Sequence, residues 1–390
     1  MNFNEIKDTS KKYLFQNYGR IDLSFTHGEG CYLYDTEGKQ YLDLVAGIAV
    51  NSIGYSHPDW VKAMQEQVSK LVHVSNLYYV EEQAKLAEKI ASITPGELDR
   101  TLFVNSGAEA NEGALKLAVR YTGKKKIMAA LNGFHGRTAA ALGATGQTKY
   151  QDSFEALISG AYQYYNYGDC ESVKKMASKD VAAIIVEPIQ GEGGVKTAPK
   201  EFFKTIRDVC DDNGTLMIVD EVQTGIGRTG KWYGIQNFDV VPDIITMAKA
   251  LGGGAPIGAV TSTEQISKVM TPGTHGTTFG GNPLVTASGC AVIDIMKKEK
   301  LVENSHDLGA RWMADLKAIQ SDKIKEVRGY GLIIGIEMDS NETAAGVQKY
   351  CRENGVLVNV CHGNTVRLIP PLIINDSQKD TFTKMLKECL

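Results

Sequence analysis

The sequence predicts an α/β protein with a mainly parallel central sheet in a large domain, accompanied by a smaller α+β domain. Short apolar, β-branched runs at 181–186, 215–219 and 244–247 are typical of buried strands. Helical patterns lie between such runs, and this alternation favours parallel strands whose two faces are covered by helices. Near residue 285 the pattern changes to two helices followed by strand-like segments, which indicates a second unit.

The composition is that of an ordinary globular protein with enough apolar residues for more than one core. Of the 390 residues, 43% are hydrophobic and 23% are charged, and a chain of this length usually forms two domains or one large domain with an appendage. The net charge is −4 and no long run of one sign occurs, which argues against nucleic acid and anionic membranes as partners.

The cysteines and the start of the chain indicate a compartment. The seven cysteines are scattered and include no C-x-x-C pair, which favours reduced thiols and provides no zinc ligands, so no metal is predicted. The first residues lack an apolar targeting core, and no stretch of 18 apolar residues is present. We therefore expect a soluble, cytoplasmic protein.

The elements before the central strands indicate a small outer unit. Alternating residues on both sides of 35–38 predict a hairpin, and helices are expected over 59–70 and 79–93. From residue 101 onwards, strands are expected at 101–104, near 127, at 181–186, 215–219 and 244–247, with helices from about 108 and over 200–211.

The last part of the chain is expected to form helices over 287–297 and 304–319, then a strand-like segment at 331–338, a further helix, and strands around 356–360 and 366–368. We therefore divide the chain into an N-terminal segment (1–45) that joins the small domain, a large domain (46–285) and a C-terminal small domain (286–390).

Two buried runs each end on a charged residue. Asp220 follows the run at 215–219, and Lys249 follows the run at 244–247 and precedes three glycines. Because ligands bind at the carboxyl edge of open α/β sheets, both residues are candidates for a site. Burial lowers the pKa of a lysine and leaves a nucleophilic amine, so the pair suits pyridoxal phosphate, with Lys on the aldehyde and Asp on the pyridine nitrogen. On these residues alone, a buried Asp–Lys ion pair explains the pattern equally well.

The motifs around the two residues resemble a known family. The segments D-E-V-Q-x-G-x-x-R-x-G and D-I-I-T-M-A-K-A-L-G-G-G are similar to the signature of the class III pyridoxal-phosphate aminotransferases. The resemblance implies fold type I, pyridoxal 5'-phosphate as cofactor, and residues 46–285 as the domain that binds it. It also implies that Lys249 is the catalytic Schiff-base lysine, that Asp220 pairs with the pyridine nitrogen and that Gln223 neighbours the ring hydroxyl.

The turn Ser106-Gly107-Ala108 connects a predicted strand to a predicted helix. A helix N-terminus with a glycine and a small hydroxyl residue binds phosphate through free backbone N–H groups and the helix dipole. By itself, the turn is more simply explained as an N-cap without a ligand. In the family the matching turn binds the cofactor phosphate, and we assign these three residues that role.

Further residues match the family's ring and substrate contacts. Phe134 corresponds to the aromatic residue stacked on the pyridine ring, whereas His135 is expected to make only a structural hydrogen bond. Arg137 corresponds to the residue that binds a substrate carboxylate, although its residue type also suits a surface loop. Glu192 and Arg367 match a pair that acts as a switch: Arg367 binds the α-carboxylate of glutamate, and Glu192 neutralises Arg367 when an ω-amino substrate enters.

Two matches implicate the assembly and the substrate. Thr278, in T-H-G-T-T-F-G-G-N-P, matches a threonine that reaches the other subunit's phosphate, which implies a homodimer with a shared active site. Tyr18 matches a tyrosine near the substrate carboxylate. The absence of a tyrosine at 47–49 differs from the ornithine δ-aminotransferases and argues against free ornithine.

The resemblance covers essentially the whole chain, and G-E-G-C-Y-L-Y-D-T-E-G-K and S-N-L-Y-Y are similar to the N-acetylornithine aminotransferases of arginine biosynthesis. It implies ping-pong transamination of N2-acetyl-L-ornithine with 2-oxoglutarate, giving N-acetyl-L-glutamate 5-semialdehyde and L-glutamate. Alternative donors are N-succinyl-diaminopimelate, N-succinylornithine, ornithine and 4-aminobutyrate. A third alternative, from another class, is a pyridoxal-phosphate-binding protein without catalytic activity.

Overall fold

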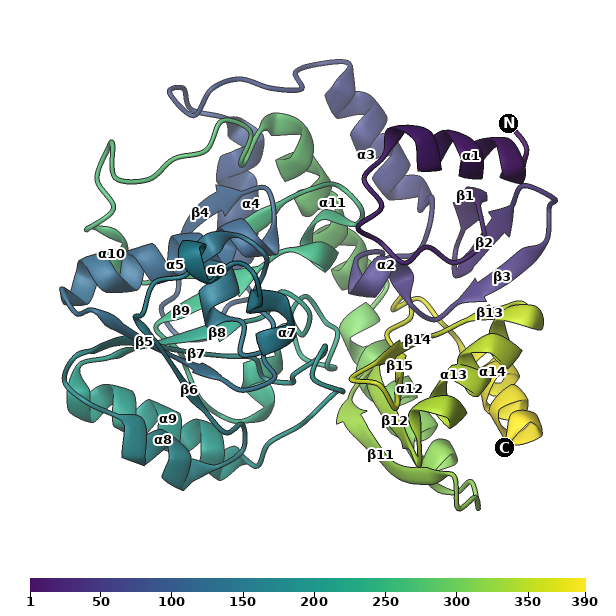
Figure 1. Cartoon of the computed structure of the whole chain (residues 1–390). Coiled ribbons are helices and arrows are strands. Elements are labelled where there is room, and N and C mark those ends of the chain that lie inside the picture. Colours follow the sequence, from purple (N-terminus) through teal and green to yellow (C-terminus); the bar gives the residue numbers. More distant parts are fainter.

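The computed structural model describes all 390 residues, which form a central seven-stranded sheet and two four-stranded sheets (Figure 1). In spatial order, the central sheet contains β4 (Arg100–Val104), β10 (Gly258–Ser262), β9 (Ile244–Met247), β8 (Leu216–Asp220), β7 (Val181–Val186), β5 (Lys126–Ala130) and β6 (Tyr162–Tyr165). Only β10 runs against the others, because it pairs antiparallel with both β4 and β9. The predicted mainly parallel sheet is confirmed.

The central strands are apolar because both faces of the sheet are covered. Every residue of β7, β8 and β9 is buried. The helix α5 (Gly107–Thr122) packs against β7, β8, β9 and β10, and α9 (Lys200–Asn213) packs against β7 and β8. Figure 1 shows α5 on one side of the sheet and α9 on the other. Such burial requires nearly continuous hydrophobic strands, and this is the signal that the sequence displays.

The N-terminal sheet joins the two ends of the chain. It contains β1 (Phe25–Glu29), β2 (Tyr32–Asp35), β3 (Gln40–Asp43) and, from the C-terminal part, β13 (Val356–Leu357). The strands β2 and β3 form the predicted hairpin, and β13 pairs parallel with β3.

The third sheet lies beside the central one and is antiparallel throughout, in the order β11 (Ile324–Tyr330), β12 (Ile333–Met338), β15 (Thr365–Leu368) and β14 (Asn359–Cys361). Its helices are α12 (Leu301–Lys317), α13 (Asn341–Glu353) and α14 (Asp376–Cys389). The sequence analysis did not identify β6, β10, β11 or α14. Three of the seven residues of β11 are charged, so it lacks the apolar run that marks the central strands.

The remaining helices connect these layers. The helix α11 (Pro283–Lys298) packs against α3 (Pro58–Val68) and α4 (Glu81–Ala91), and the boundary proposed at residue 285 falls in its first turn. The other helices are α1 (Phe3–Tyr13), α2 (Ala46–Ala49), α6 (Ala139–Ala144), α7 (Thr148–Gln151), α8 (Cys170–Met176), α10 (Glu264–Ser267) and the 3₁₀ turns η1 (Glu155–Leu157), η2 (Gly234–Asn237) and η3 (Lys249–Gly252).

One apolar core unites the central sheet with the C-terminal part of the chain. It contains 59 buried residues, among them Val186 and Val219 of the central strands and Trp312 and Phe382 of α12 and α14. No helix combines the length and the apolar character needed to cross a membrane.

Candidate active site

A cavity of about 460 Å³ lies at the carboxyl ends of β8 and β9, where the sequence placed its two charged candidates. These strands are neighbours, with Asp220 opposite Thr246. The lining brings together residues from strand ends and loops that are far apart in the sequence. It includes nine predicted site residues, Ser106, Gly107, Ala108, Phe134, Arg137, Glu192, Asp220, Gln223 and Lys249, together with Glu187.

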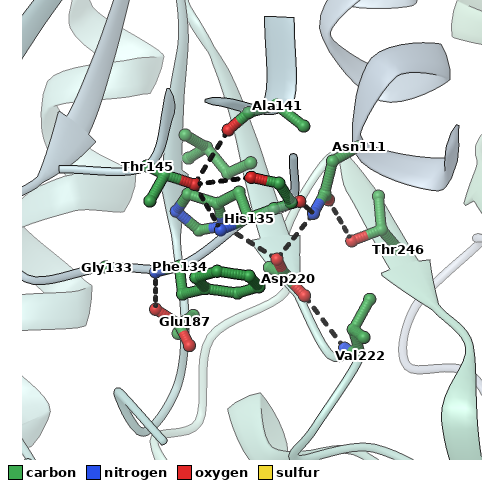
Figure 2. A network of polar contacts seen from close by, with 12 residues as sticks. Asn111, Gly133, Phe134, His135, Ala141, Thr145, Glu187, Asp220, Val222 and Thr246 are labelled. Atoms are coloured by element: carbon green, nitrogen blue, oxygen red, sulfur yellow. Dashed lines mark hydrogen bonds and ion pairs between the residues drawn. The ribbon is translucent and has the colours of Figure 1, made fainter. Parts of the chain in front are cut away.

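Asp220 is buried and held by three donors (Figure 2). Its Oδ2 accepts from Asn111 Nδ2 and from His135 Nδ1, each at 2.7 Å, and its Oδ1 accepts from Val222 N–H at 2.9 Å. Asn111 in turn donates to the His135 carbonyl and accepts from the Thr246 hydroxyl, both at 2.7 Å. The carboxylate therefore has a fixed position at the end of β8.

His135 and Glu187 place further titratable groups beside Asp220. Burial of the His135 imidazole opposes its charge, but the Asp220 carboxylate outweighs burial and raises the pKa of His135. His135 Nε2 is buried and has no hydrogen-bond partner. Burial raises the pKa of Glu187 to about 7, although this carboxyl accepts from Phe134 N–H at 3.0 Å.

Glu221, the second acid at the end of β8, has a different role. Its carboxyl accepts from the N–H groups of Gly234 and Ile235 at 2.8 Å and from the Thr224 hydroxyl at 2.5 Å. Burial raises the pKa of Glu221 to about 7. Because successive side chains of a strand point to opposite faces, only Asp220 faces the cavity, and Glu221 stabilises the 3₁₀ turn η2.

Lys249 begins η3 directly after β9 and faces the cavity with a free amine. The amine makes no hydrogen bond or ion pair, and burial lowers the pKa of Lys249. Its backbone φ is +41°, a left-handed conformation that is costly for a residue with a side chain. Gly253 and Gly254 follow with positive φ angles of 55° and 117°.

The N-terminus of α5 reaches the cavity through Ser106, Gly107 and Ala108. The Ser106 hydroxyl caps the helix by accepting from Glu109 N–H at 3.2 Å, which leaves the first backbone N–H groups directed out of the helix. Gly107 is required by packing, because a Cβ there would lie 2.7 Å from Val222 Cγ1.

Phe134 and Arg137 also line the cavity, and Tyr150 packs beside both of them. The Phe134 ring contacts Tyr150 edge to face, with 5.7 Å between ring centroids. The Arg137 guanidinium is exposed and lies 4.1 Å from the Tyr150 centroid and 5.6 Å from the Phe134 centroid. Stacking of this kind orients the planar guanidinium and leaves its N–H groups available for a carboxylate.

Arg367 extends from β15 of the C-terminal sheet towards the same region. Its Nη1 donates to Glu192 Oε1 at 2.7 Å and to Gln223 Oε1 at 3.0 Å, and its Nε donates to Asn359 Oδ1 at 3.1 Å. Burial acts to raise the pKa of Glu192, but Arg367 lowers it below its usual value. Arg367 is fully buried, and its Nη2 has no partner.

Three predicted residues do not line the cavity: Arg367 contacts its lining residues Glu192 and Gln223, whereas Tyr18 and Thr278 lie apart from it. Tyr18 is 70% exposed, and the Arg20 guanidinium lies 5.6 Å from its ring centroid. Thr278 is exposed, in the loop before α11. Neither side chain contacts the other site residues within this chain.

The cavity residues fit pyridoxal phosphate. An unpaired lysine amine suits an aldehyde, a buried carboxylate suits a protonated ring nitrogen, and an aromatic ring suits stacking. The free N–H groups at the start of α5 suit a phosphate. Each of these groups was predicted from the sequence, whereas Asn111 and Glu187 were not predicted as part of the site, and only a structural hydrogen bond was expected for His135. The signals available were a polar residue on the buried face of α5 and an acid at the end of β7.

Comparisons with known proteins agree with this geometry. The aminotransferase class III family matches residues 13–390. The acetylornithine aminotransferase of Methanothermobacter thermautotrophicus is 44% identical over 388 residues, which cover 99% of this chain and 98% of that protein.

Solved structures show the same fold. The crystal structure of the acetylornithine aminotransferase from Elizabethkingia anophelis matches with a TM-score of 0.90 and 36% identity, covering 100% of this chain and 98% of that chain. The crystal structure of the ornithine aminotransferase from Toxoplasma gondii matches with a TM-score of 0.95 and 31% identity, covering 100% of this chain and 95% of that chain.

Proposed function

The chain belongs to the class III aminotransferases, and from this premise we propose that it transfers the δ-amino group of N2-acetyl-L-ornithine to 2-oxoglutarate. The products are N-acetyl-L-glutamate 5-semialdehyde and L-glutamate, a step of arginine biosynthesis. The observation that carries the substrate assignment is the 44% identity to an acetylornithine aminotransferase over 99% of this chain. The identity to the ornithine aminotransferase structure is lower, at 31%.

Pyridoxal 5'-phosphate supplies the aldehyde that accepts the amine and a ring that takes up the electrons of the reacting bond. We assign its contacts to Ser106, Gly107 and Ala108 for the phosphate, Phe134 for the ring face, Gln223 for the ring hydroxyl and Asp220 for the ring nitrogen. The three hydrogen bonds to Asp220 hold its carboxylate in one position, which supports a role in keeping a proton on that nitrogen when the cofactor is bound.

Lys249 is the proposed acid–base group. Burial lowers the pKa of Lys249, so a larger fraction of the amine is unprotonated and able to accept a proton from the substrate carbon. With the cofactor bound, the same amine would then donate the proton to the carbon atom of the cofactor aldehyde. A group that moves a proton in both directions requires freedom from fixed partners, which is consistent with the absence of hydrogen bonds at its amine.

Two arginines are proposed to bind the substrate carboxylates. Arg137 binds the α-carboxylate of N-acetylornithine and the distal carboxylate of glutamate. Arg367 binds the α-carboxylate of glutamate, and its unpartnered Nη2 supports this role, because a buried guanidinium N–H without an acceptor is costly. An ω-amino donor has no carboxylate beside its reacting amine. When such a donor is bound, Glu192 neutralises Arg367 through the contact of 2.7 Å.

The assembly is proposed to be a homodimer in the cytoplasm. Thr278 then reaches the cofactor phosphate of the second subunit, and Tyr18 approaches the substrate carboxylate. Both residues are exposed in the single chain, which supports the proposal that they meet a second subunit. We also propose the division into an N-terminal segment (1–45) that joins the small domain, a large domain (46–285) and a C-terminal domain (286–390), which the pairing of β13 with β3 supports.

The proposal is tested by measuring kcat/KM for a panel of amino donors with 2-oxoglutarate. The panel contains N-acetylornithine, N-succinylornithine, N-succinyl-diaminopimelate, ornithine and 4-aminobutyrate. We expect N-acetylornithine to be preferred and the Lys249→Ala variant to be inactive with every donor. A preference for ornithine or 4-aminobutyrate would contradict the substrate assignment, and turnover by Lys249→Ala would contradict the catalytic assignment.

A further inference from the structure

Arg328 lies outside the cavity, in β11 of the C-terminal sheet, in the same row of residues as Arg367. Arg328 pairs with Gly335 of β12, and Gly335 pairs with Arg367 of β15. Residues opposite one another on neighbouring strands point to the same face, and neighbouring strands are about 4.8 Å apart. The two arginines therefore stand on one face of the sheet, roughly 10 Å apart, with a glycine between them.

The segment 192–195, which we call the switch segment, lies across this row. At one end, the Glu192 carboxylate contacts Arg367 at 2.7 Å. At the other end, Arg328 Nε donates to the carbonyls of Gly194 and Val195 at 3.1 Å, and Arg328 Nη2 donates to the Gly194 carbonyl at 2.6 Å. One arginine thus holds a side chain of the switch segment, and the other holds its main chain.

The space between the two arginines is filled by Val195. A Cβ built at Gly335 would lie 2.7 Å from Val195 Cβ, so a glycine at this position allows Val195 to pack on the sheet. Val195 is fully buried and has a φ of +52°, a strained conformation that persists only where surrounding contacts enforce it. The contacts of Arg328 with the Gly194 and Val195 carbonyls are of this kind.

The two arginines differ in how readily their partners exchange. Arg367 binds a side-chain carboxylate, and a substrate carboxylate can take its place because it has the same charge and geometry. Arg328 binds main-chain carbonyls, and its Nη1 also donates to Glu326 at 2.6 Å and to Glu337 at 2.5 Å. Arg328 is only 6% exposed and its charge is already neutralised by two carboxylates, so a substrate anion gains little by binding there.

We propose that Arg328 is a positioning residue that keeps the switch segment docked on the C-terminal sheet while Glu192 leaves Arg367. This inference rests on the proposed exchange between Glu192 and a substrate carboxylate. With an ω-amino donor bound, both arginines hold the segment. With glutamate or 2-oxoglutarate on Arg367, only Arg328 of the two still holds it, so that Glu192 returns to the same place after product release.

The first test separates the two half-reactions in Arg328→Met. We expect the apparent KM for 2-oxoglutarate to rise at least tenfold, while the half-reaction of N-acetylornithine changes less than threefold. Arg328→Lys, which keeps the charge but not the forked geometry, is expected to lie between wild type and Arg328→Met, and it preserves the test if the methionine variant does not fold. Equal losses in both half-reactions would indicate a purely structural role and would overturn the proposal.

A matched control is Lys196→Met. Lys196 follows the switch segment and pairs with Glu337 at 2.7 Å, but the pair is partly exposed and such pairs contribute little. We expect both half-reactions of this variant to remain within threefold of wild type. A selective loss for 2-oxoglutarate in Lys196→Met as large as that of Arg328→Met would assign the effect to the charge of Glu337 instead.

The second test does not depend on turnover. Hydrogen exchange of a peptide covering 190–196 is followed with and without glutarate, a dicarboxylate that lacks a reacting group. In wild type we expect protection in both states, and in Arg328→Met a loss of protection that appears only with glutarate. Protection that is unchanged, or that is lost equally without glutarate, would overturn the proposal. If wild type failed to use N-acetylornithine, the substrate assignment would fail while this test would still decide the role of Arg328.

Discussion

The two ends of the cavity are built in different ways. At the first end, Asp220 accepts three hydrogen bonds, and Asn111 is itself bonded to Thr246 and to the His135 carbonyl. At the second end, Arg367 is fully buried, yet its Nη2 has no partner, and its charged partner is the side-chain carboxylate of Glu192. The Asp220 carboxylate is thus held by three donors, although His135 Nε2 beside it has no partner, whereas the Arg367 guanidinium keeps Nη2 without an acceptor.

The difference follows from the physical cost of burying charge. A buried charge is tolerated when it is paired and hydrogen-bonded, and a fully satisfied network is rigid. A buried guanidinium whose Nη2 has no acceptor retains a driving force to bind a further carboxylate. A ping-pong enzyme requires both properties, because the cofactor stays while two substrates alternate. Three variants test this division.

The largest effect is expected from Asp220→Asn, which alters the hydrogen-bond network at the first end of the cavity. The amide keeps the shape of the side chain but removes the negative charge that holds a proton on the ring nitrogen. We expect kcat of both half-reactions to fall by roughly 10²- to 10³-fold, the range seen when one preorganised electrostatic contact is lost. The measurement is single-turnover kinetics with N-acetylornithine and with 2-oxoglutarate. A loss confined to one half-reaction would show that Asp220 serves a substrate and not the cofactor.

A smaller effect, different for the two substrates, is expected from Glu192→Gln, which alters the end of the cavity near Arg367. Arg367 then lacks its counter-charge whenever an ω-amino donor is bound, and removing one partner of a buried charge pair costs about 2 kcal/mol or more. We expect kcat/KM for N-acetylornithine to fall by roughly 10- to 100-fold, since about 1.4 kcal/mol corresponds to a factor of ten. The value for 2-oxoglutarate should change less than threefold. Similar losses for both substrates would contradict the switch.

The smallest effect concerns stability at the first end of the cavity and depends on pH. Burial raises the pKa of Glu187 to about 7, so the folded protein binds this proton more tightly than the unfolded chain does. Stability is therefore lost as pH rises from the unfolded value near 4.5 through 7, because the carboxylate becomes charged in a buried place.

Glu187→Gln removes this penalty and keeps an oxygen that can accept from Phe134 N–H. We expect the variant to be more stable than wild type by about 1 to 2 kcal/mol at pH 8 and nearly equal to it at pH 5. Urea unfolding of the cofactor-free protein at the two pH values measures the difference. A variant less stable than wild type at pH 8 would mean that His135 stabilises the Glu187 carboxylate by more than burial destabilises it.

The parts of the site that could be predicted are those that a short stretch of chain encodes. Asp220 and Lys249 stand directly after apolar runs, and the Ser106-Gly107-Ala108 turn stands between a strand and a helix, so local patterns marked all three. The partners of Asp220 could not be found in this way, because Asn111 and His135 approach it from 109 and 85 residues away.

The strands that were missed illustrate the same limit. The strand β10 lies between the edge strand β4 and β9, although nothing in its five residues indicates an antiparallel position. The row that joins Arg328, Gly335 and Arg367 exists only through the register of β11, β12 and β15. A shift of one residue would turn these side chains to the opposite face.

The sequence by itself determined the buried strands, the parallel character of the sheet and the identity of the charged residues at its edge, because strand period, apolar runs and turn residues are local properties. Only the tertiary structure decided which acid faces the cavity, which donors hold Asp220 and that Arg367 beside the cavity keeps an unpartnered Nη2. These outcomes depend on distances between segments that are remote in the chain. Such distances are set by the packing of the whole core and by the register of paired strands.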